Sequence, residues 1–120
     1  PYILHPLRVM FSIREKGMGP LAQAAAVLHD VAEDHADGWN MILKGNLGEV
    51  VYHAIDSVTR RENEDYFDYI RRAKANPIGR EIKLADLKDN MDIKCKPMID
   101  KNREVRMAKY AKARKILMDG

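Results

Sequence analysis

The feature that most constrains this sequence is an apolar, alanine-rich run that leads directly into a group of ionisable side chains. Residues 24–28 read Ala-Ala-Ala-Val-Leu, and His29, Asp30, Glu33 and Asp34 follow at once. In a helix that turns by about 100° per residue, this imidazole and these carboxylates fall in one sector. Carboxylates gathered in this way repel one another unless a cation lies among them. The stretch therefore predicts a buried helix with a metal site at its end; an ordinary helix end with solvated acids is the alternative.

Length and composition limit the class of protein. A chain of 120 residues is long enough for one domain and too short for two, so residues 1–120 are expected to form a single domain. Hydrophobic residues make up 46% and charged residues 32%, which is typical of a globular chain. The net charge of +3 comes from 21 basic residues dispersed among 18 acidic ones, so binding to a nucleic-acid polymer is not expected.

Membrane and export signals are not visible in the sequence. The longest uninterrupted apolar run is too short to span a bilayer, and no signal peptide is seen. The chain has one cysteine, Cys95, which excludes an internal disulfide framework and is compatible with a reducing compartment. We therefore expect a cytoplasmic protein without a membrane partner. Because the chain opens on Pro1 without an initiator Met, residues upstream are expected to have been processed or not included.

Apolar residues recur at helical spacing along the chain, and no segment carries a persuasive strand pattern. Proline, glycine and asparagine mark the starts and ends of these repeats. Helices are predicted from Pro6 to about Gly17, from Pro20 to the acidic group, over Trp39–Leu43, over Gly48–Val58, from Tyr66 to Ala73, from Pro77 to about Met91, and from Asp100 or Asn102 to about Leu117. The fold class is therefore all-α, a single compact helical bundle with no substantial sheet.

Local signals refine these boundaries. Asn76 is expected to cap the helix that begins at Pro77. The apolar positions of the first helix include Leu7, Met10 and Phe11, and those of the last helix include Val105. The polar segment 59–63 is expected to form a loop.

Two further residues could complete the metal site. Asp86 lies among apolar residues of the predicted helix from Pro77, and a desolvated carboxylate there needs a partner. A metal ion or an arginine could supply that partner. Asn90 follows one turn later on the same face. His5 precedes the first predicted helix, where a capping or core role is the alternative. Two imidazoles and two carboxylates suit a borderline divalent metal such as Mn²⁺, Fe²⁺ or Zn²⁺.

The order of these residues resembles the HD superfamily of metal-dependent phosphohydrolases. The surrounding segments resemble one branch of it, the hydrolase domain of RelA/SpoT homologues, over about residues 2–93. The similar segments are Tyr2–Leu7, Leu28–Asp34, Val58–Arg61, Ile82–Asp86 and Asn90-Met91. The resemblance implies an HD-type helical bundle of the small alarmone hydrolase type, whose metal ligands are His5, His29, Asp30 and Asp86.

The resemblance also implies a reaction and further site residues. The reaction is the Mn²⁺-dependent removal of pyrophosphate from the 3′ position of guanosine tetra- or pentaphosphate. Glu33 and Asp34 would orient and activate the attacking water, and Asn90 would contact the substrate. The segment Thr59-Arg60-Arg61 would lie near the phosphates.

The charge of the phosphates needs cations as well. Arg8, Arg60, Arg61 and Lys83 are candidates to offset the charge that spreads over the phosphoryl oxygens. For each, a solvated basic side chain is the alternative.

The sequence departs from the larger family members directly after Asn90-Met91. Asp92 and Ile93 stand where arginine and threonine are usual, and that threonine is part of the nucleotide pocket. Two alternatives therefore stay open, namely a phosphohydrolase acting on another nucleotide phosphoester and a non-catalytic helical module that binds a nucleotide or a protein. The basic last helix is the best support for the second alternative. A small-molecule nucleotide is the expected partner, and a homo-oligomer is left open.

Overall fold

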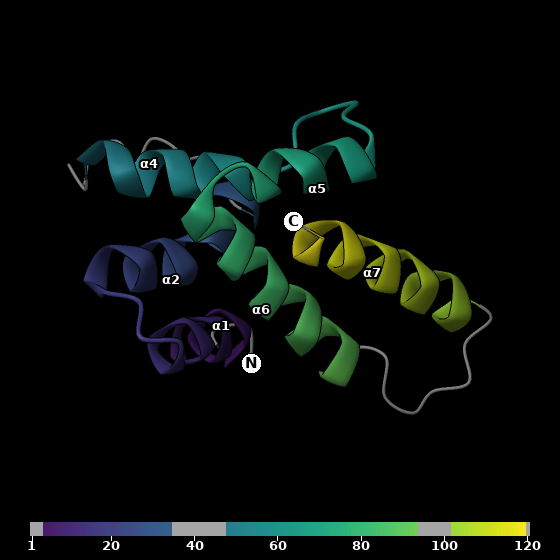
Figure 1. Ribbon diagram of the computed structural model, residues 1–120, viewed down its shortest axis with the longest axis horizontal. Coiled ribbons are helices and arrows are strands. Elements are labelled where there is room, and N and C mark those ends of the chain that lie inside the picture. The colour runs from purple at the N-terminus through teal and green to yellow at the C-terminus, as the bar shows by residue number, and fades with distance from the viewer. Residues whose placement is uncertain (1–3, 35–47, 94–101, 120) are drawn as a thin grey trace.

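The computed structural model describes residues 4–34, 48–93 and 102–119, and of residues 31–34 and 93 it describes the backbone alone. Within these ranges the chain forms only helices, which confirms the all-α prediction. They are α1 (Leu4–Glu15), α2 (Pro20–Asp34), α4 (Gly48–Ser57), α5 (Tyr66–Lys74), α6 (Pro77–Ile93) and α7 (Arg103–Met118) (Figure 1). The predicted short helix over 39–43, Cys95 and Asp100 lie outside the described residues. No helix in the described ranges is long and apolar enough to cross a membrane.

Helix α6 runs through the middle of the fold. It packs against α1, α2 and α4 on one side and against α5 and α7 on the other (Figure 1). Asn76 caps it as predicted, because its Oδ1 accepts hydrogen bonds from the main-chain N–H groups of Ile78 and Gly79 at 3.0 and 2.9 Å. Ile82 and Leu87 are fully buried. Because α6 is central, its side chains contact helices on both of its sides.

The start of α6 crosses the end of α4 at very short range. A Cβ atom placed on Gly79 would lie 1.9 Å from Ser57 Oγ, so a larger residue would push the two helices apart. Ser57 is buried there, and its hydroxyl donates to the carbonyl of Ala54 at 2.7 Å. Glycine at 79 therefore fixes the distance between these two helices.

Helix α2 is buried between α1 and α4. Its inward face carries Ala22, Ala25 and Ala26, which are at most 4% exposed. Methyl side chains allow neighbouring helices to approach closely, so the next residues on this face enter the interior as well. The prediction of an alanine-rich helix with a buried face is confirmed, but its predicted central position is wrong, because α6 and not α2 packs against all the other described helices.

The predictions for α1 are wrong in two respects. The helix begins at Leu4, so His5 lies in its first turn and not before it. The buried residues are Pro6, Val9 and Ile13, whereas Phe11 is 49% exposed. Helix α1 has two adjacent apolar stripes, and only packing against α2 and α6 decides which of them is buried.

The last helix also differs from expectation. Asn102 occupies the N-cap position of α7, but its side chain accepts no capping hydrogen bond. Val105 is 67% exposed, and the fully buried residues are Ala113 and Leu117. The main anchor of α7 on the bundle is therefore in its C-terminal half, and much of its basic N-terminal half is open to solvent.

Arg72 of α5 organises the loop between α4 and α5. Its guanidinium donates to the carbonyl oxygens of Asp56 and Thr59, at 2.7 and 2.8 Å, and to both carboxylate oxygens of Glu64, at 2.9 and 2.8 Å. The Asp56 carbonyl also accepts from the main-chain N–H of Thr59 at 3.2 Å, so Arg72 adds a second donor to the last turn of α4 and ties it to the loop at Thr59. Glu64 in turn accepts from the main-chain N–H of Arg61 at 3.0 Å. The loop that carries residues 59–61 is thereby held in one conformation.

This network predicts a specific loss of stability in acid. The hydrogen bonds from Arg72 lower the pKa of Glu64 from 4.5 to about 2. A carboxyl group whose pKa is lower in the folded than in the unfolded chain stabilises above its unfolded pKa, and this stabilisation is lost as the pH falls towards the folded pKa. Urea unfolding at about pH 5 and about pH 2 should show a larger drop in the free energy of unfolding for the natural chain than for Glu64→Gln, by about 1 kcal/mol.

Glu62→Gln provides the matched control, because Glu62 is an exposed glutamate of the same loop. It should keep the pH dependence of the natural chain. Identical pH dependence in Glu64→Gln would contradict the assigned role of the Arg72–Glu64 pair.

Candidate metal centre

Four ionisable side chains converge where α1, α2 and α6 meet. His5, His29, Asp30 and Asp86 each offer one nitrogen or oxygen atom, and these atoms lie within 4.8 Å of one another. His5 Nε2 is 2.7 Å from Asp86 Oδ1 and 3.7 Å from Asp30 Oδ2. His29 Nε2 is 3.1 Å from Asp30 Oδ1 and 3.7 Å from Asp86 Oδ1. The structure thus brings together the four residues that the sequence placed at one site.

The shorter distances between these atoms, 2.7–3.7 Å, are close to those between neighbouring ligands of one divalent ion. Nitrogen and oxygen ligands bind such ions at about 2.0–2.2 Å, so neighbouring ligand atoms lie about 3 Å apart. The side chains of His29, Asp30 and Asp86 are 3, 11 and 9% exposed, whereas that of His5 is 20% exposed. His5 is therefore the most accessible of the four.

The orientation of His29 provides a test of whether an ion fits. Its Nδ1 donates to the carbonyl oxygen of Ala26 in the preceding turn of α2. This contact directs Nε2 towards the carboxylates of Asp30 and Asp86, yet Nε2 has no hydrogen bond within the described residues. A histidine whose Nδ1 is held by a carbonyl presents Nε2 to a metal. The residues present therefore fit a divalent ion.

His5 is held by a partner that the sequence analysis did not assign. Its Nδ1 is 2.5 Å from Asp89 Oδ2, and Arg8 donates to both oxygens of Asp89, at 2.6 and 3.2 Å. A carboxylate behind a histidine fixes the ring and leaves Nε2 towards the centre. The available signal was the three-residue spacing from Asp86 to Asp89, which puts both carboxylates near one face of α6.

The carboxylate of Asp86 is ionised although it is buried. Burial would raise its pKa, but Lys83, with Nζ 2.7 Å from Oδ2, and the two imidazoles hold the pKa well below its usual range. Burial lowers the pKa of His29, and the carboxylates of Asp86 and Asp30 more than offset this effect, so the pKa is raised. The hydrogen bond with Asp86 raises the pKa of His5 to about 9. Lys83 and the two imidazoles therefore stabilise the negative charge of Asp86.

Three other predicted site residues belong to the same helices as the ligands, namely Asn90 in α6 and Glu33 and Asp34 in α2. Asn90 is buried, with Nδ2 3.5 Å from Asp86 Oδ2, and its Oδ1 has no partner within the described residues. Glu33 and Asp34 continue α2 beyond Asp30, but their side chains lie outside the description.

The predicted phosphate-binding residues other than Lys83 make the following contacts. Arg8 is paired with Asp89, as described above. The Thr59 hydroxyl donates to the carbonyl of Ile55 at 2.7 Å, and Arg61 is exposed and pairs with Asp56 at 3.3 Å. Arg60 donates to the carbonyl oxygen of Glu64 and lies over the ring of Tyr66.

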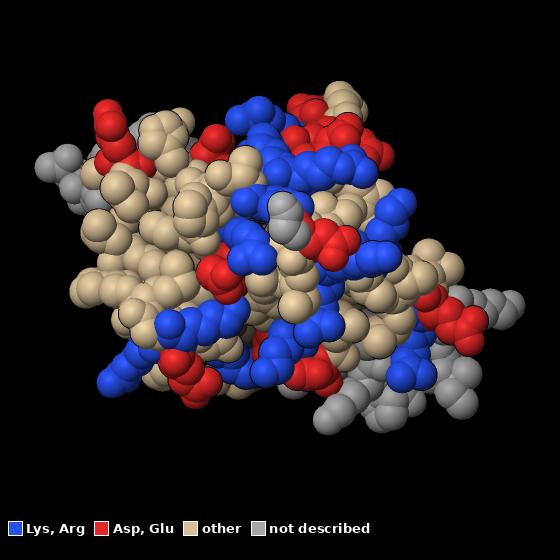
Figure 2. All heavy atoms as spheres, viewed as in Figure 1, with Lys and Arg blue, Asp and Glu red and all other residues tan. Residues whose placement is uncertain are grey.

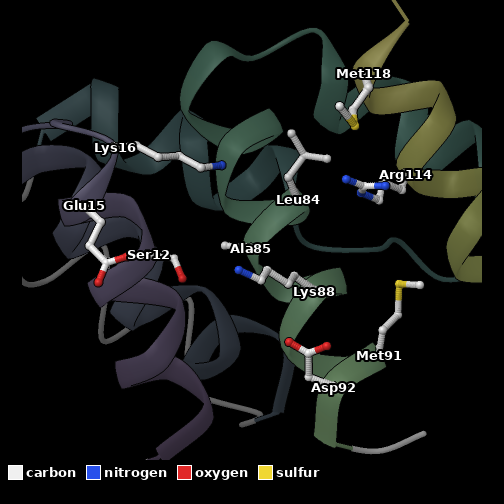
Figure 3. Close-up of a pocket in the computed structure, with 10 residues that line it drawn as sticks. All are labelled: Ser12, Glu15, Lys16, Leu84, Ala85, Lys88, Met91, Asp92, Arg114 and Met118. Carbon is white, nitrogen blue, oxygen red and sulfur yellow. The ribbon is translucent and has the colours of Figure 1, made fainter.

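A pocket of about 610 Å³ opens on the opposite face of α6, between α1 and α7 (Figure 3). Leu84, Lys88 and Met91 line it, and on a helix these positions point away from Asp86 and Asn90. None of the predicted site residues lines this pocket. On the face drawn in Figure 2, Lys and Arg side chains have Asp and Glu among them, which agrees with dispersed charge.

An all-α chain with this mixed nitrogen and oxygen centre is suited to hold a divalent ion, and comparison with known proteins narrows the class further. No family model matches the chain. The chain is 33% identical over 99 residues to a guanosine-3′,5′-bis(diphosphate) 3′-pyrophosphohydrolase of Aquifex aeolicus, covering 76% of the chain and 14% of that relative. It is 32% identical over 115 residues to a GTP pyrophosphokinase of Streptomyces coelicolor, covering 96% of the chain and 13% of the relative.

A probable GTP pyrophosphokinase of Mycobacterium leprae is 35% identical over 101 residues, covering 76% of the chain and 13% of the relative. The chain is therefore related to RelA/SpoT-type enzymes. It spans only about one seventh of the length of these relatives. Their names describe both the hydrolysis and the synthesis of nucleotide pyrophosphates.

The contact between His5 and Asp89 predicts an effect on metal affinity. We expect the chain to bind one Mn²⁺, and Asp89→Asn to weaken this binding by about 10–100-fold, because the substitution removes the carboxylate that orients the imidazole. Isothermal titration calorimetry with Mn²⁺ measures the affinity. Asp68→Asn removes an exposed carboxylate of α5 that pairs with Arg71 at 2.9 Å, and it should leave the affinity unchanged. Equal affinities in the two variants would exclude the supporting role of Asp89.

Proposed function

We propose that this chain is a metal-dependent phosphohydrolase that removes pyrophosphate from the 3′ position of guanosine tetra- or pentaphosphate. The observation that carries the proposal is the convergence of His5, His29, Asp30 and Asp86, with His29 Nε2 directed at two carboxylates and without a hydrogen bond to any described residue. The similarity to a relative named as a pyrophosphohydrolase for this nucleotide supports the choice of substrate.

In the proposed reaction, His5, His29, Asp30 and Asp86 would hold the ion. A bound divalent ion supplies a water of lowered pKa and polarises a phosphoryl oxygen. The buried carboxylate of Asp86, whose pKa is held well below its usual range, supplies a negative charge at neutral pH. Asp89 positions His5, and Ala26 positions His29, so the two imidazoles need no rearrangement to bind an ion.

Proton transfer is assigned to Glu33 and Asp34. These residues follow Asp30 by three and four positions in α2, which places them one helical turn further along the same side of the helix. A carboxylate in this position can accept the proton of the attacking water. We propose that Glu33 and Asp34 accept this proton, and that the four metal ligands take no part in the proton transfer.

Recognition of the substrate is assigned to Asn90 and to basic residues. The buried Oδ1 of Asn90 has no partner within the described residues, so it is available to a hydroxyl or amine of the nucleotide. Lys83 is within hydrogen-bond distance of Asp86 and brings a positive charge to the edge of the centre. Its charge would offset the negative charge that develops on phosphoryl oxygens.

A second candidate is the hydrolysis of another nucleotide phosphoester at the same centre. The observation that favours it is the pair Asp92 and Ile93, which replaces the arginine and threonine usual in the larger family members. Asp92 is exposed and lines the pocket on the opposite face of α6. A panel of nucleotides separates the two candidates.

The test is activity of the Mn²⁺-loaded chain on guanosine tetraphosphate and on other nucleotides, with chromatographic detection of the products. We expect release of pyrophosphate and GDP from guanosine tetraphosphate. Glu33→Gln and Asp34→Asn should lower kcat by at least about 100-fold while Mn²⁺ affinity is retained, because a carboxylate that accepts a proton is lost and the ligands are not. Glu49→Gln, an exposed acid of α4, should have no effect. No turnover of any nucleotide by metal-loaded protein would overturn the proposal.

A further inference from the structure

Beside the metal centre, cations and aromatic rings from the loop after α4 and from α5, α6 and α7 form a second cluster. We call Arg60, Tyr66, Lys83 and Lys109 the basic wall. The guanidinium of Arg60 lies 5.6 Å from the centroid of the Tyr66 ring, and Lys109 Nζ lies 4.6 Å from the same centroid. Lys83 Nζ lies 5.2 Å from the ring of Tyr69, whose centroid is 6.0 Å from that of Tyr66. Arg60 and Lys109, from distant parts of the sequence, thus meet at the Tyr66 ring, and Lys83 lies at the adjacent Tyr69 ring.

The positive charge of the basic wall exceeds the negative charge of its partners. Lys83 pairs with Asp86, whereas the hydrogen bonds of the Arg60 guanidinium to the described part of the chain go to the neutral carbonyl oxygen of Glu64, at 3.1 and 2.9 Å. Lys109 makes no hydrogen bond or ion pair among the described residues and lies over the rings of Tyr66 and Tyr110. Aromatic faces attract cations but do not neutralise them.

The positive charges near Lys109 affect its pKa. Its pKa is lowered by burial and by the positive charges of Arg60, Lys83 and Arg106. Like charges held this close destabilise the folded chain unless an anion lies among them. An anion is therefore the ligand that this arrangement favours.

Tyr66 adds a hydrogen-bond donor to the same place. Its hydroxyl oxygen is buried and has no hydrogen-bond partner within the described residues. Burial is the main cause of its raised pKa, so the hydroxyl keeps its proton at neutral pH and can donate it. Buried hydroxyl groups usually have a partner, so this one indicates a ligand from outside the described residues.

We propose that the basic wall binds a phosphate or pyrophosphate group of the nucleotide substrate, with the Lys109 ammonium and the Tyr66 hydroxyl as its donors. This inference rests on the proposed function and deepens it, because it names a second subsite for the same substrate. Lys83 joins the two subsites. Its Nζ is 2.7 Å from the Asp86 carboxylate and 5.2 Å from the centroid of the Tyr69 ring, which lies beside Tyr66 of the basic wall. The substrate class is a nucleotide that carries a phosphate group distinct from the one at the metal centre.

The arrangement also assigns a role to the basic last helix. Most of the cations of α7 are exposed, and the anchor of the helix is at its C-terminal end. Lys109 differs because it lies over the Tyr66 ring, as Arg60 does, and its pKa is lowered by the positive charge of Lys83. One residue of this helix is therefore a substrate-binding residue, and the sequence alone did not distinguish it from its neighbours.

The first test measures the binding of inorganic pyrophosphate to the chain by calorimetry, without added metal and at fixed ionic strength. Lys109→Met should weaken binding by about tenfold, and Tyr66→Phe should weaken it several-fold, because each removes one donor to the anion. Lys112→Met is the matched control. Lys112 lies one turn further along α7 and 4.2 Å from the ring of Phe67, so the substitution removes the same charge outside the basic wall. Lys109→Arg should retain binding.

The second test uses steady-state kinetics of the Mn²⁺-loaded chain with guanosine tetraphosphate. Lys109→Met should raise KM by about tenfold with little change in kcat, because the residue binds a group that does not react. Melting temperatures of the variants exclude a loss of folding as the cause. If the natural chain turns over the nucleotide while Lys109→Met matches Lys112→Met in both KM and pyrophosphate affinity, the inference is overturned. If pyrophosphate binding depends on Lys109 but no nucleotide is hydrolysed, the anion site is supported and the proposed function fails.

Discussion

The ionised carboxylate of Asp86 is the interaction on which the rest of this structure depends. It is 7% exposed, and a buried carboxylate without partners would be very costly. Its ionised form is stabilised by Lys83, His5 and His29, which lie beside it. These partners come from α6 itself, from the first turn of α1 and from the inner face of α2. The packing of three helices is therefore required to place one charge.

The side chains on helix α6 differ in chemistry around its circumference, and each side faces a different environment. Asp86 and Asn90 face the centre, Ile82 and Leu87 face the apolar core, and Leu84 and Met91 face the pocket near α7. The close crossing at Gly79 and the alanine face of α2 hold α6 near its neighbours. Small residues in the scaffold are what allow large charged side chains to meet at its centre.

Two groups of side chains with opposite charge lie close together in this chain. Carboxylates gather at the meeting point of α1, α2 and α6, and cations gather on the tyrosine rings of α5. Lys83 contacts both groups. The first group favours a cation as its ligand and the second an anion. A divalent ion and a phosphorylated nucleotide together would satisfy both, which is why the metal centre and the basic wall are interpreted as parts of one proposed site.

The sequence by itself determined the all-α class and the cap at Asn76, because helical spacing and capping are local properties. It grouped His5 and Asp86 with His29 and Asp30 through their order along the chain, which resembles that of a known family, and only the packing of α1, α2 and α6 brings these side chains together. Only the tertiary structure decided which apolar stripe of α1 is buried, since two stripes are present and the positions of α2 and α6 select one. It also decided that Asp89 supports His5 and that Lys109 faces Tyr66. Such pairings join helices far apart in the sequence, and residue type and spacing along one helix do not specify the partner across an interface.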